Sequence, residues 1–452
     1  MLKLRLLFKK RQILVHTITF IALGFLLAIV VTRIDHDALG IIDNIPKIFT
    51  TTPSMAKNIL TTLAGSLLTI TTFTFSTVLT VLSIYSSNFT PRIVENFLHK
   101  KITMQVLGLF VGAFIYSILT LWKVRLNQER SVISGTVAVF MSIICILYFV
   151  YFVREVVNSV QTTQVIRQLT NDANDAIDKA RAMIDEDKSY KDSGIDTSQE
   201  PYILHSPTSG YFEGVDYERL SSLLKKYIGH MHILPMLGDY VPEGSPIARF
   251  WIDKEEKFQE AVEDDSSGPP ENLEDCFLIQ HEREALTDFQ FCITKIIEIC
   301  VRAVSTGIGD PNTAIMGVHR LGECLGKIAA VEPVPNVIRS SEKFMITTHF
   351  FILKNILHLS FEQILHYCRD DVSVNRAVLQ TLYTIYSNAH PKNKKAILDF
   401  ENYAFEHMKI GLKHEVDIQK LEDVRIHEQE EEQSELDSGR DANTVENEEE
   451  KE

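Results

Sequence analysis

Four long uncharged runs fill the first third of the chain, and shorter patterned segments separated by polar stretches follow. The runs are Ile13–Val31, Leu60–Ser87, Met104–Trp122 and Val132–Val153. A helix needs about 20 apolar residues to cross the hydrocarbon core of a bilayer. The pattern therefore predicts a four-helix transmembrane domain over residues 1–153. The first run is expected to remain as an anchor, because no small-residue cleavage site follows its apolar stretch.

The second run differs from the others because hydroxyl side chains recur through it. Alternating Thr and Phe around Thr71–Ser76 resemble a strand pattern, but a lone strand in lipid would leave its backbone groups unpaired, so a helix is favoured. On a helix the hydroxyls from Thr62 to Ser87 form one stripe, interrupted by Phe73. The candidate polar stripe consists of Thr62, Ser66, Thr69, Ser76, Thr80 and Ser83.

Two interpretations of the candidate polar stripe stay open. Small hydroxyl residues let membrane helices approach closely and hydrogen-bond to one another, and this packing role is favoured. Alternatively, the stripe lines a water-filled path formed where several copies meet. A proton-coupled transporter is disfavoured, because the four runs contain no Asp, Glu, Lys or Arg and proton relays place ionisable groups inside the membrane.

The distribution of Lys and Arg predicts the orientation in the membrane. The N-terminus is basic, and the segment after the second run carries Arg92, Lys100 and Lys101. Cytoplasmic loops carry an excess of such residues, so both termini are expected in the cytoplasm and the protein in the cell inner (plasma) membrane. Lys123, followed by Arg125 and Arg130, runs against this pattern, because these residues would lie outside.

The region after the fourth run is expected to be cytoplasmic and of mixed α and β structure. Arg154–Lys188 has helical spacing and is expected to continue the fourth span. Packing of this helix into a core is favoured over a coiled-coil seam between subunits. The predicted segments are a membrane-exit helix and linker at 154–199, a small β-rich module at 200–253, a polar linker at 254–275, a helical domain at 276–425 and an acidic disordered tail at 426–452.

The β-rich module is predicted from alternating and β-branched residues. Strands are expected at Tyr202–His205, Tyr211–Val215, His232–Leu234 and Ile247–Trp251, with a helix at Tyr217–Ile228. The segment GDYVPEGSPIARF resembles the hairpin turn of lipoyl and biotin carrier domains. It has no lysine at the tip that those domains modify, so no cofactor is expected.

The turn VSTGIGDPNTA, at 304–314, is predicted to join two helices. Gly307 is expected to end the first helix, Asp310 to cap the second, and Pro311 to occupy its first turn. A helix N-terminus can hold an anion. Because Asp310 already occupies the capping place, a structural role is favoured for Gly307, Asp310 and Pro311.

Other candidate chemistry is sparse. His230 and His232 share one face of a strand, whereas His349, His358 and His366 are spaced too widely for zinc on one helix. P-loop, G-x-G-x-x-G, G-x-S-x-G and H-E-x-x-H motifs are absent from the sequence. We therefore expect no catalytic, cofactor-binding or metal-ligating residues and no enzymatic activity.

Charge and cysteines refine this picture. The net charge of −15 resides mainly in residues 426–452, and the folded middle carries no basic stripe, which argues against a nucleic-acid partner. The six cysteines include no C-x-x-C pair, so reduced, buried thiols are expected.

The chain resembles a family of predicted bacterial membrane proteins that is catalogued only as a domain of unknown function. The matching segments are LAGSLLTITTFTFS at 63–76, SSNFTPRIVENFL at 86–98, LGLFVGAFIYSIL at 107–119, SPTSGYFEGVD at 206–216, GDYVPEGSPIA at 238–248 and VRAVSTGIGDPNTA at 301–314. The resemblance implies architecture and location but no reaction.

Together these patterns predict an α-helical integral membrane protein with a cytoplasmic α+β portion. The expected function is a non-enzymatic, membrane-anchored assembly or sensing protein. The alternative is an oligomeric, channel-like protein whose second transmembrane helix lines the path. The expected partners are the lipid bilayer and further copies of the chain. The sequence identifies no small-molecule or ion ligand.

Overall fold

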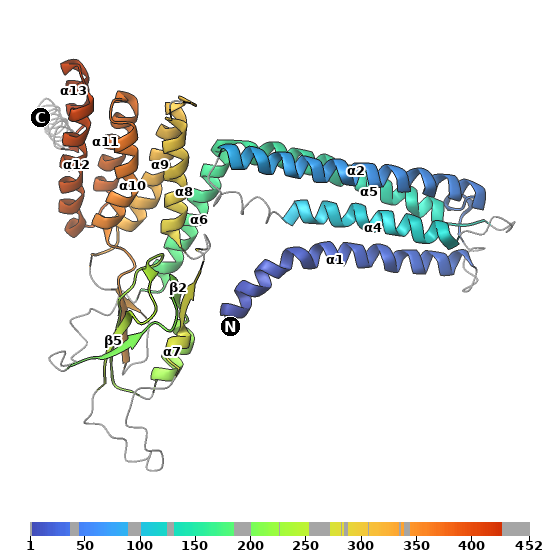
Figure 1. The fold of residues 1–452 in the computed structure, drawn as a ribbon, viewed down its shortest axis with the longest axis horizontal. Coiled ribbons are helices and arrows are strands. Elements are labelled where there is room, and N and C mark those ends of the chain that lie inside the picture. Colours follow the sequence, from blue (N-terminus) through green and yellow to red (C-terminus); the bar gives the residue numbers. More distant parts are fainter. Residues whose placement is uncertain are drawn as a thin grey trace, which may run out of the picture. The chain divides into compact units, whose positions relative to one another are not determined.

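The chain folds into two compact units, residues 1–165 and 166–452. The computed structural model describes residues 2–36, 45–88, 101–123, 131–184, 200–225, 227–252, 272–281, 283, 288–305, 307–333, 336–338 and 344–426 (Figure 1). The predicted acidic tail after Ile426 and most of the motif at 86–98 lie outside these residues.

In the part of the first unit that the structure describes there are four long helices and one short 3-10 helix. The helices are α1 (Leu2–Asp35), α2 (Pro53–Asn88), α4 (Lys101–Lys123) and α5 (Ser134–Val160), with η2 (Lys47–Phe49) before α2. Each long helix contains a stretch that is long and apolar enough to cross a bilayer. The prediction of four long apolar helices is therefore confirmed, although α1, α2 and α4 extend beyond their apolar runs at both ends and α5 extends beyond its run only at the C-terminal end.

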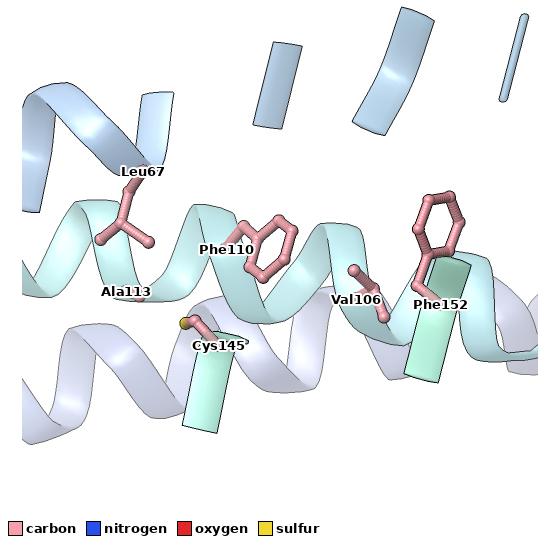
Figure 2. Packing of buried hydrophobic residues seen from close by; sticks show 6 residues of the cluster. All are labelled: Leu67, Val106, Phe110, Ala113, Cys145 and Phe152. Atoms are coloured by element: carbon pink, nitrogen blue, oxygen red, sulfur yellow. The ribbon is translucent and has the colours of Figure 1, made fainter. Parts of the chain in front are cut away.

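Helix α4 is the most enclosed member of the first unit. Its apolar stretch is 44% buried, against 17–22% for the other three, because it packs against α1, α2 and α5. Figure 2 shows the cluster at the centre of this packing, with side chains from α2, α4 and α5. Its buried members are Leu67, Val106, Phe110, Ala113, Cys145 and Phe152.

Glycines bring α1 and α4 into backbone contact. Gly108 and Gly112 form a G-x-x-x-G pair on α4. A Cβ on Gly108 would lie 2.9 Å from the Cα of Thr17 on α1. The Thr17 hydroxyl also donates a hydrogen bond to the Met104 carbonyl, at 3.1 Å. Small residues allow such approach in membrane helices, and this explains the glycines of the LGLFVGAFIYSIL motif.

Hydrogen bonds join the helices at the end of the first unit where α1 ends and α5 begins. The Ile133 amide donates to Asp35 Oδ1, at 2.8 Å, so a buried carboxylate on α1 receives a donor from the start of α5. Tyr116 on α4 donates to the Ser134 carbonyl, at 2.9 Å. Thr51 pairs with Val132 through two backbone hydrogen bonds of 2.8 Å. These contacts hold together the end of α1, the starts of α2 and α5, and Tyr116 of α4.

The prediction of one continuous helix after the fourth span was wrong. Helix α5 ends at Val160, Gln161 is extended with ψ of 119°, and α6 (Thr162–Ala182) begins anew. Val160, Thr162 and Thr163 are β-branched and therefore weak helix formers. The apolar face of α6, which includes Ile166, Leu169 and Ile177, is buried within the second unit, as the core-packing interpretation requires.

The second unit contains two small sheets. The five-stranded sheet has the order β1 (Tyr202–His205), β5 (Pro246–Ile252), β3 (Gly229–Ile233), β8 (Phe344–Thr348) and β7 (Asn336–Ile338). The pair β3–β8 is parallel, and the other pairs are antiparallel. The three-stranded sheet has the order β4 (Tyr240–Val241), β2 (Gly210–Val215) and β6 (Phe277–Gln280). All four predicted strands are present: β1 has the predicted ends, and the ends of β2, β3 and β5 are shifted.

Two expectations about this region differ from the structure. Residues 276–425 were expected to be helical, yet they contribute β6, β7 and β8. These strands have only three to five residues, too few to show a period-2 pattern beside long helical runs. The GDYVPEGSPIARF segment was expected to form a hairpin, but β4 pairs with β2 and β5 pairs with β1 and β3, so its turn joins two different sheets.

The other described elements of the second unit are helices. Short elements α7 (Tyr217–Leu224) and η4 (Glu274–Cys276) accompany the strands. The helical layer comprises α8 (Phe289–Ala303), α9 (Pro311–Ala329), α10 (Leu353–Tyr367), α11 (Val372–Ser387), α12 (Pro391–Gly411) and α13 (Glu415–Glu422). Helices α8 to α12 stand side by side in Figure 1 and bury their apolar faces against one another.

Candidate functional site

The candidate polar stripe lies on the outer face of α2. Thr62, Ser66, Thr69, Ser76, Thr80 and Ser83 are all exposed, as is Phe73, which interrupts them. The opposite face of α2 buries Leu60, Ala64, Leu67 and Val81. The stripe therefore points away from the helices that α2 packs against within its own chain.

The threonines of the stripe are satisfied by their own helix. Thr62 donates to the Asn58 carbonyl at 2.9 Å, Thr69 to Gly65 at 3.0 Å, and Thr80 to Ser76 at 3.0 Å. A hydroxyl bonded to the carbonyl one turn earlier leaves no unmet donor. The threonines can therefore face an apolar environment without another chain.

The predicted turn between α8 and α9 is a helix cap. Asp310 accepts hydrogen bonds from the Thr313 amide at 3.2 Å and the Thr313 hydroxyl at 2.6 Å, and these bonds lower the pKa of the Asp310 carboxyl. Pro311 is the first residue of α9, as predicted. The predicted role of Gly307 was wrong. Helix α8 ends at Ala303, and the glycine with left-handed backbone is Gly309, with φ of +62°.

A buried ion pair holds the start of α8 against the turn before β4. Asp288 is fully buried and caps α8 by accepting from the Phe291 amide at 3.0 Å. Arg283 Nε donates to Asp288 Oδ2 at 2.7 Å. Burial raises the pKa of Asp288, and the Arg283 guanidinium opposes that shift. Gly238 has φ of +86°, and a Cβ there would lie 2.2 Å from the Arg283 guanidinium. The GDYVPEGSPIA motif therefore has a structural use.

A histidine–threonine cluster occupies one face of the five-stranded sheet. Thr347 on β8 lies 2.7 Å from His230 Nε2 and 3.0 Å from His232 Nδ1, measured at its hydroxyl oxygen. The ring of His349 lies 5.4 Å from that of His232 and nearly perpendicular to it. Trp251 on β5 stacks parallel to His230, with ring centres 5.5 Å apart.

The cluster holds three histidines whose pKa values are all lowered by burial. Burial, together with His232, lowers the pKa of His230 to about 4. Burial lowers the pKa of His232, and His349 and Arg249 lower it further by repulsion. Arg249 stands directly opposite His232 in the β3–β5 register and is exposed.

The sequence placed His230 and His232 on one face but missed their neighbours. Thr347 belongs to a strand that was not predicted, and it meets His232 through a parallel pairing with a long connection. Arg249 lies on a predicted strand, but its register against β3 was not available from the pattern. Within the described residues, no group of three or more His, Cys, Asp or Glu is arranged to hold a metal ion.

The cysteines are buried and unpaired, as predicted. Burial raises the pKa of Cys300, Cys324 and Cys368 to about 12. The thiolate is the reactive form of cysteine, so these three residues are suited to packing rather than to chemistry.

Comparisons with known proteins agree with the architecture. Residues 10–384 match the model of DUF2254, described as a predicted membrane protein. Uncharacterized proteins of Mycobacterium bovis and Mycobacterium tuberculosis are each 24% identical to the chain over 398 residues, which covers 83% of this chain and 72% of the relative. No solved structure matches.

Proposed function

Because the chain belongs to the DUF2254 family of predicted membrane proteins, we propose that it is a non-enzymatic protein of the cell inner membrane that assembles with copies of itself. The observation that carries this proposal is the outward orientation of the candidate polar stripe on α2. A face of small hydroxyl residues that its own helices leave exposed is suited to another membrane helix.

The length of the stripe supports a membrane interface. Thr62 and Ser83 are 21 positions apart, which corresponds to about 32 Å along a helix. The hydrocarbon core of a bilayer is about 30 Å thick. The stripe would therefore present small side chains to a neighbouring helix through the depth of the core, except at Phe73. Threonine hydroxyls that bond their own helix can also turn toward a carbonyl of a second copy at little cost.

Several carboxylates of the second unit already have structural uses, which favours a non-enzymatic role. Asp310 and Asp371 cap helices, and Asp288 both caps α8 and binds Arg283. Glu401 is fully buried and holds Arg425 and the Ile426 amide. These groups stabilise the fold and are not left to act as general acids or bases.

We also propose that both termini lie in the cytoplasm. Lys and Arg near the N-terminus and after α2 favour this orientation. Protease treatment of sealed right-side-out vesicles should then leave a C-terminal epitope intact, whereas inside-out vesicles should lose it. Cleavage in the opposite preparation would reverse the assignment.

The assembly proposal is tested by mass in mild detergent. We expect an oligomer for the native chain and a shift toward monomer for the combined variant Ser66→Leu, Thr69→Leu, Ser76→Leu and Thr80→Leu. The matched control places four leucines on the exposed face of α5, at Val139, Ile143, Ile146 and Val150. A monomeric native chain would count against the proposal, as would equal dissociation of both variants.

A channel-like protein is the alternative, and the same stripe favours it. Copies that met around an axis with their stripes inward would enclose a hydroxyl-lined path. The stripe variant should then change ion flux into liposomes while the α5 control does not. Absent or unchanged flux in the native chain and the variant would exclude the path and leave assembly alone.

A further inference from the structure

We propose that Arg249, His232 and His349 form a binding site for a phosphate-type oxyanion on the five-stranded sheet. The site lies in the second unit and is independent of the proposed assembly through α2. Its ligand is a phosphate group, carried either by a free phosphate or by a lipid headgroup.

The backbone register brings the first two side chains together. Arg249 and His232 are direct partners in the antiparallel β3–β5 pair, so they stand on the same face of the sheet. Such partners have Cβ atoms about 5 Å apart. The His349 ring, 5.4 Å from that of His232, adds a third group that can donate a hydrogen bond to an anion. Three donors from two strands and the residue after β8 therefore converge.

Thr347 orients the His232 ring toward a ligand. The Thr347 hydroxyl donates to the Met231 carbonyl at 3.3 Å, so its oxygen accepts from His230 Nε2 and His232 Nδ1. This assignment of protons follows from the network. With Nδ1 committed to Thr347, Nε2 is on the side of the ring directed away from Thr347. An oxyanion at Nε2 requires a second proton on the ring, and the site therefore prefers protonated His232.

The charges around His232 favour an anion. The titratable or charged groups that face it in the described residues are His230 on β3, Arg249 on β5 and His349 after β8. Thr347 on β8 is neutral. All three neighbours are cationic or become so on protonation, and they repel a proton on His232. No described carboxylate pairs with Arg249, whereas Arg219, Arg320 and Arg425 each bind one. A phosphate group would offset this repulsion.

Linkage fixes the direction of the pH dependence. Because the ligand favours protonated His232, bound phosphate raises the pKa of that ring and binding takes up a proton. Burial and the neighbouring His349 and Arg249 hold the pKa of free His232 below its ordinary value near 6.5, so affinity should rise as the pH falls below that value, by up to about tenfold per pH unit for one proton. Protonation of the phosphate to its monoanion in the same range opposes part of this rise. Arg249 keeps its charge throughout and supplies the part of the binding that does not depend on pH.

The test uses the full chain in detergent and titration calorimetry with inorganic phosphate at pH 5.5, 6.5 and 7.5. We expect saturable binding that strengthens as the pH falls. Arg249→Gln should weaken binding at every pH by tenfold or more, and His232→Gln should reduce the pH dependence to the part that His349 supplies. Arg219→Gln is the matched control, because that arginine is exposed in the same unit but pairs with Asp275. Unchanged thermal midpoints will verify that the variants are folded.

A second arm identifies the source of the phosphate group. The native chain and Arg249→Gln are each placed in nanodiscs of phosphatidylcholine with and without phosphatidic acid. The measurement is the protection of the second unit from hydrogen exchange. Protection that needs both phosphatidic acid and Arg249 assigns the site to a lipid headgroup, whereas calorimetric binding of phosphate alone assigns it to a free phosphate. The proposal is overturned if neither probe binds, or if Arg249→Gln behaves like Arg219→Gln.

Discussion

Gly24 of α1 and Gly112 of α4 touch through their backbones. A Cβ on Gly24 would lie 2.2 Å from the Gly112 carbonyl oxygen. The contact belongs to a seam that also includes Gly108 and Thr17, and it holds α1 against the most enclosed helix of the first unit. Close helix packing in this chain therefore depends on glycines, and the hydroxyl stripe on α2 remains available for another role.

The glycine seam leads to a first prediction. Gly112→Ala should destabilise the first unit by about 1–3 kcal/mol, because the added methyl would force α1 and α4 apart. Gly65→Ala is the control, since its Cβ would meet nothing within 4 Å on α2. Unfolding in mixed micelles, followed by circular dichroism, provides the measurement. Equal loss of stability in the two variants would show that the seam is not tight.

The two turn glycines of the GDYVPEGSPIA motif allow a matched comparison. Gly238 and Gly244 both have positive φ, at +86° and +76°, but only Gly238 lies against Arg283 and Asp288. Gly244→Ala should lose only about 1 kcal/mol of stability, because alanine is strained at positive φ. Gly238→Ala should lose more, because it also displaces a buried ion pair. Chemical denaturation of the full chain compares them, and similar values for both would remove the proposed role of the ion pair.

Glu401 should anchor the last described segment of the chain. It accepts from the Ile426 amide at 3.0 Å and from Arg425 at 3.2 Å, while the glutamate is fully buried. Removing one member of a buried pair costs about 3–5 kcal/mol, so Glu401→Ala should release residues after α13. Hydrogen exchange should rise there. Glu406→Ala, which removes an exposed pair with Lys409, is the control and should leave exchange unchanged.

Acid should destabilise the second unit through His230. Its folded pKa, about 4, lies below the unfolded value near 6.5. The unfolded state therefore binds more protons between these values, and stability is full above pH 6.5 and falls as the pH drops toward 4. His230→Gln should flatten this part of the stability curve. The exposed His366→Gln should retain the slope, and a curve for His230→Gln that matched the native one would contradict the assignment.

Sequence patterns predicted the helices and strands of this fold better than the contacts between them. The four apolar helices follow from the length of the uncharged runs, and strands β1, β2, β3 and β5 follow from alternating and β-branched residues. Strand β8 was missed because five residues carry too little pattern. The cluster at His232 was missed with it, since Thr347 arrives through a parallel pairing more than a hundred residues away. Likewise, the stripe was visible as a helical face, but its outward orientation depends on how α2 packs on α4 and α5.

Assembly of copies through α2 is tested most directly by cysteine crosslinking in native membranes. All six native cysteines are buried and unpaired. A disulfide formed between copies on oxidation can therefore be attributed to the introduced cysteine. Thr69→Cys and Ser76→Cys should give oxidised dimers, whereas Ile143→Cys on the exposed face of α5 should remain monomeric. Monomers from both stripe positions, or dimers from Ile143→Cys alone, would contradict assembly through the stripe.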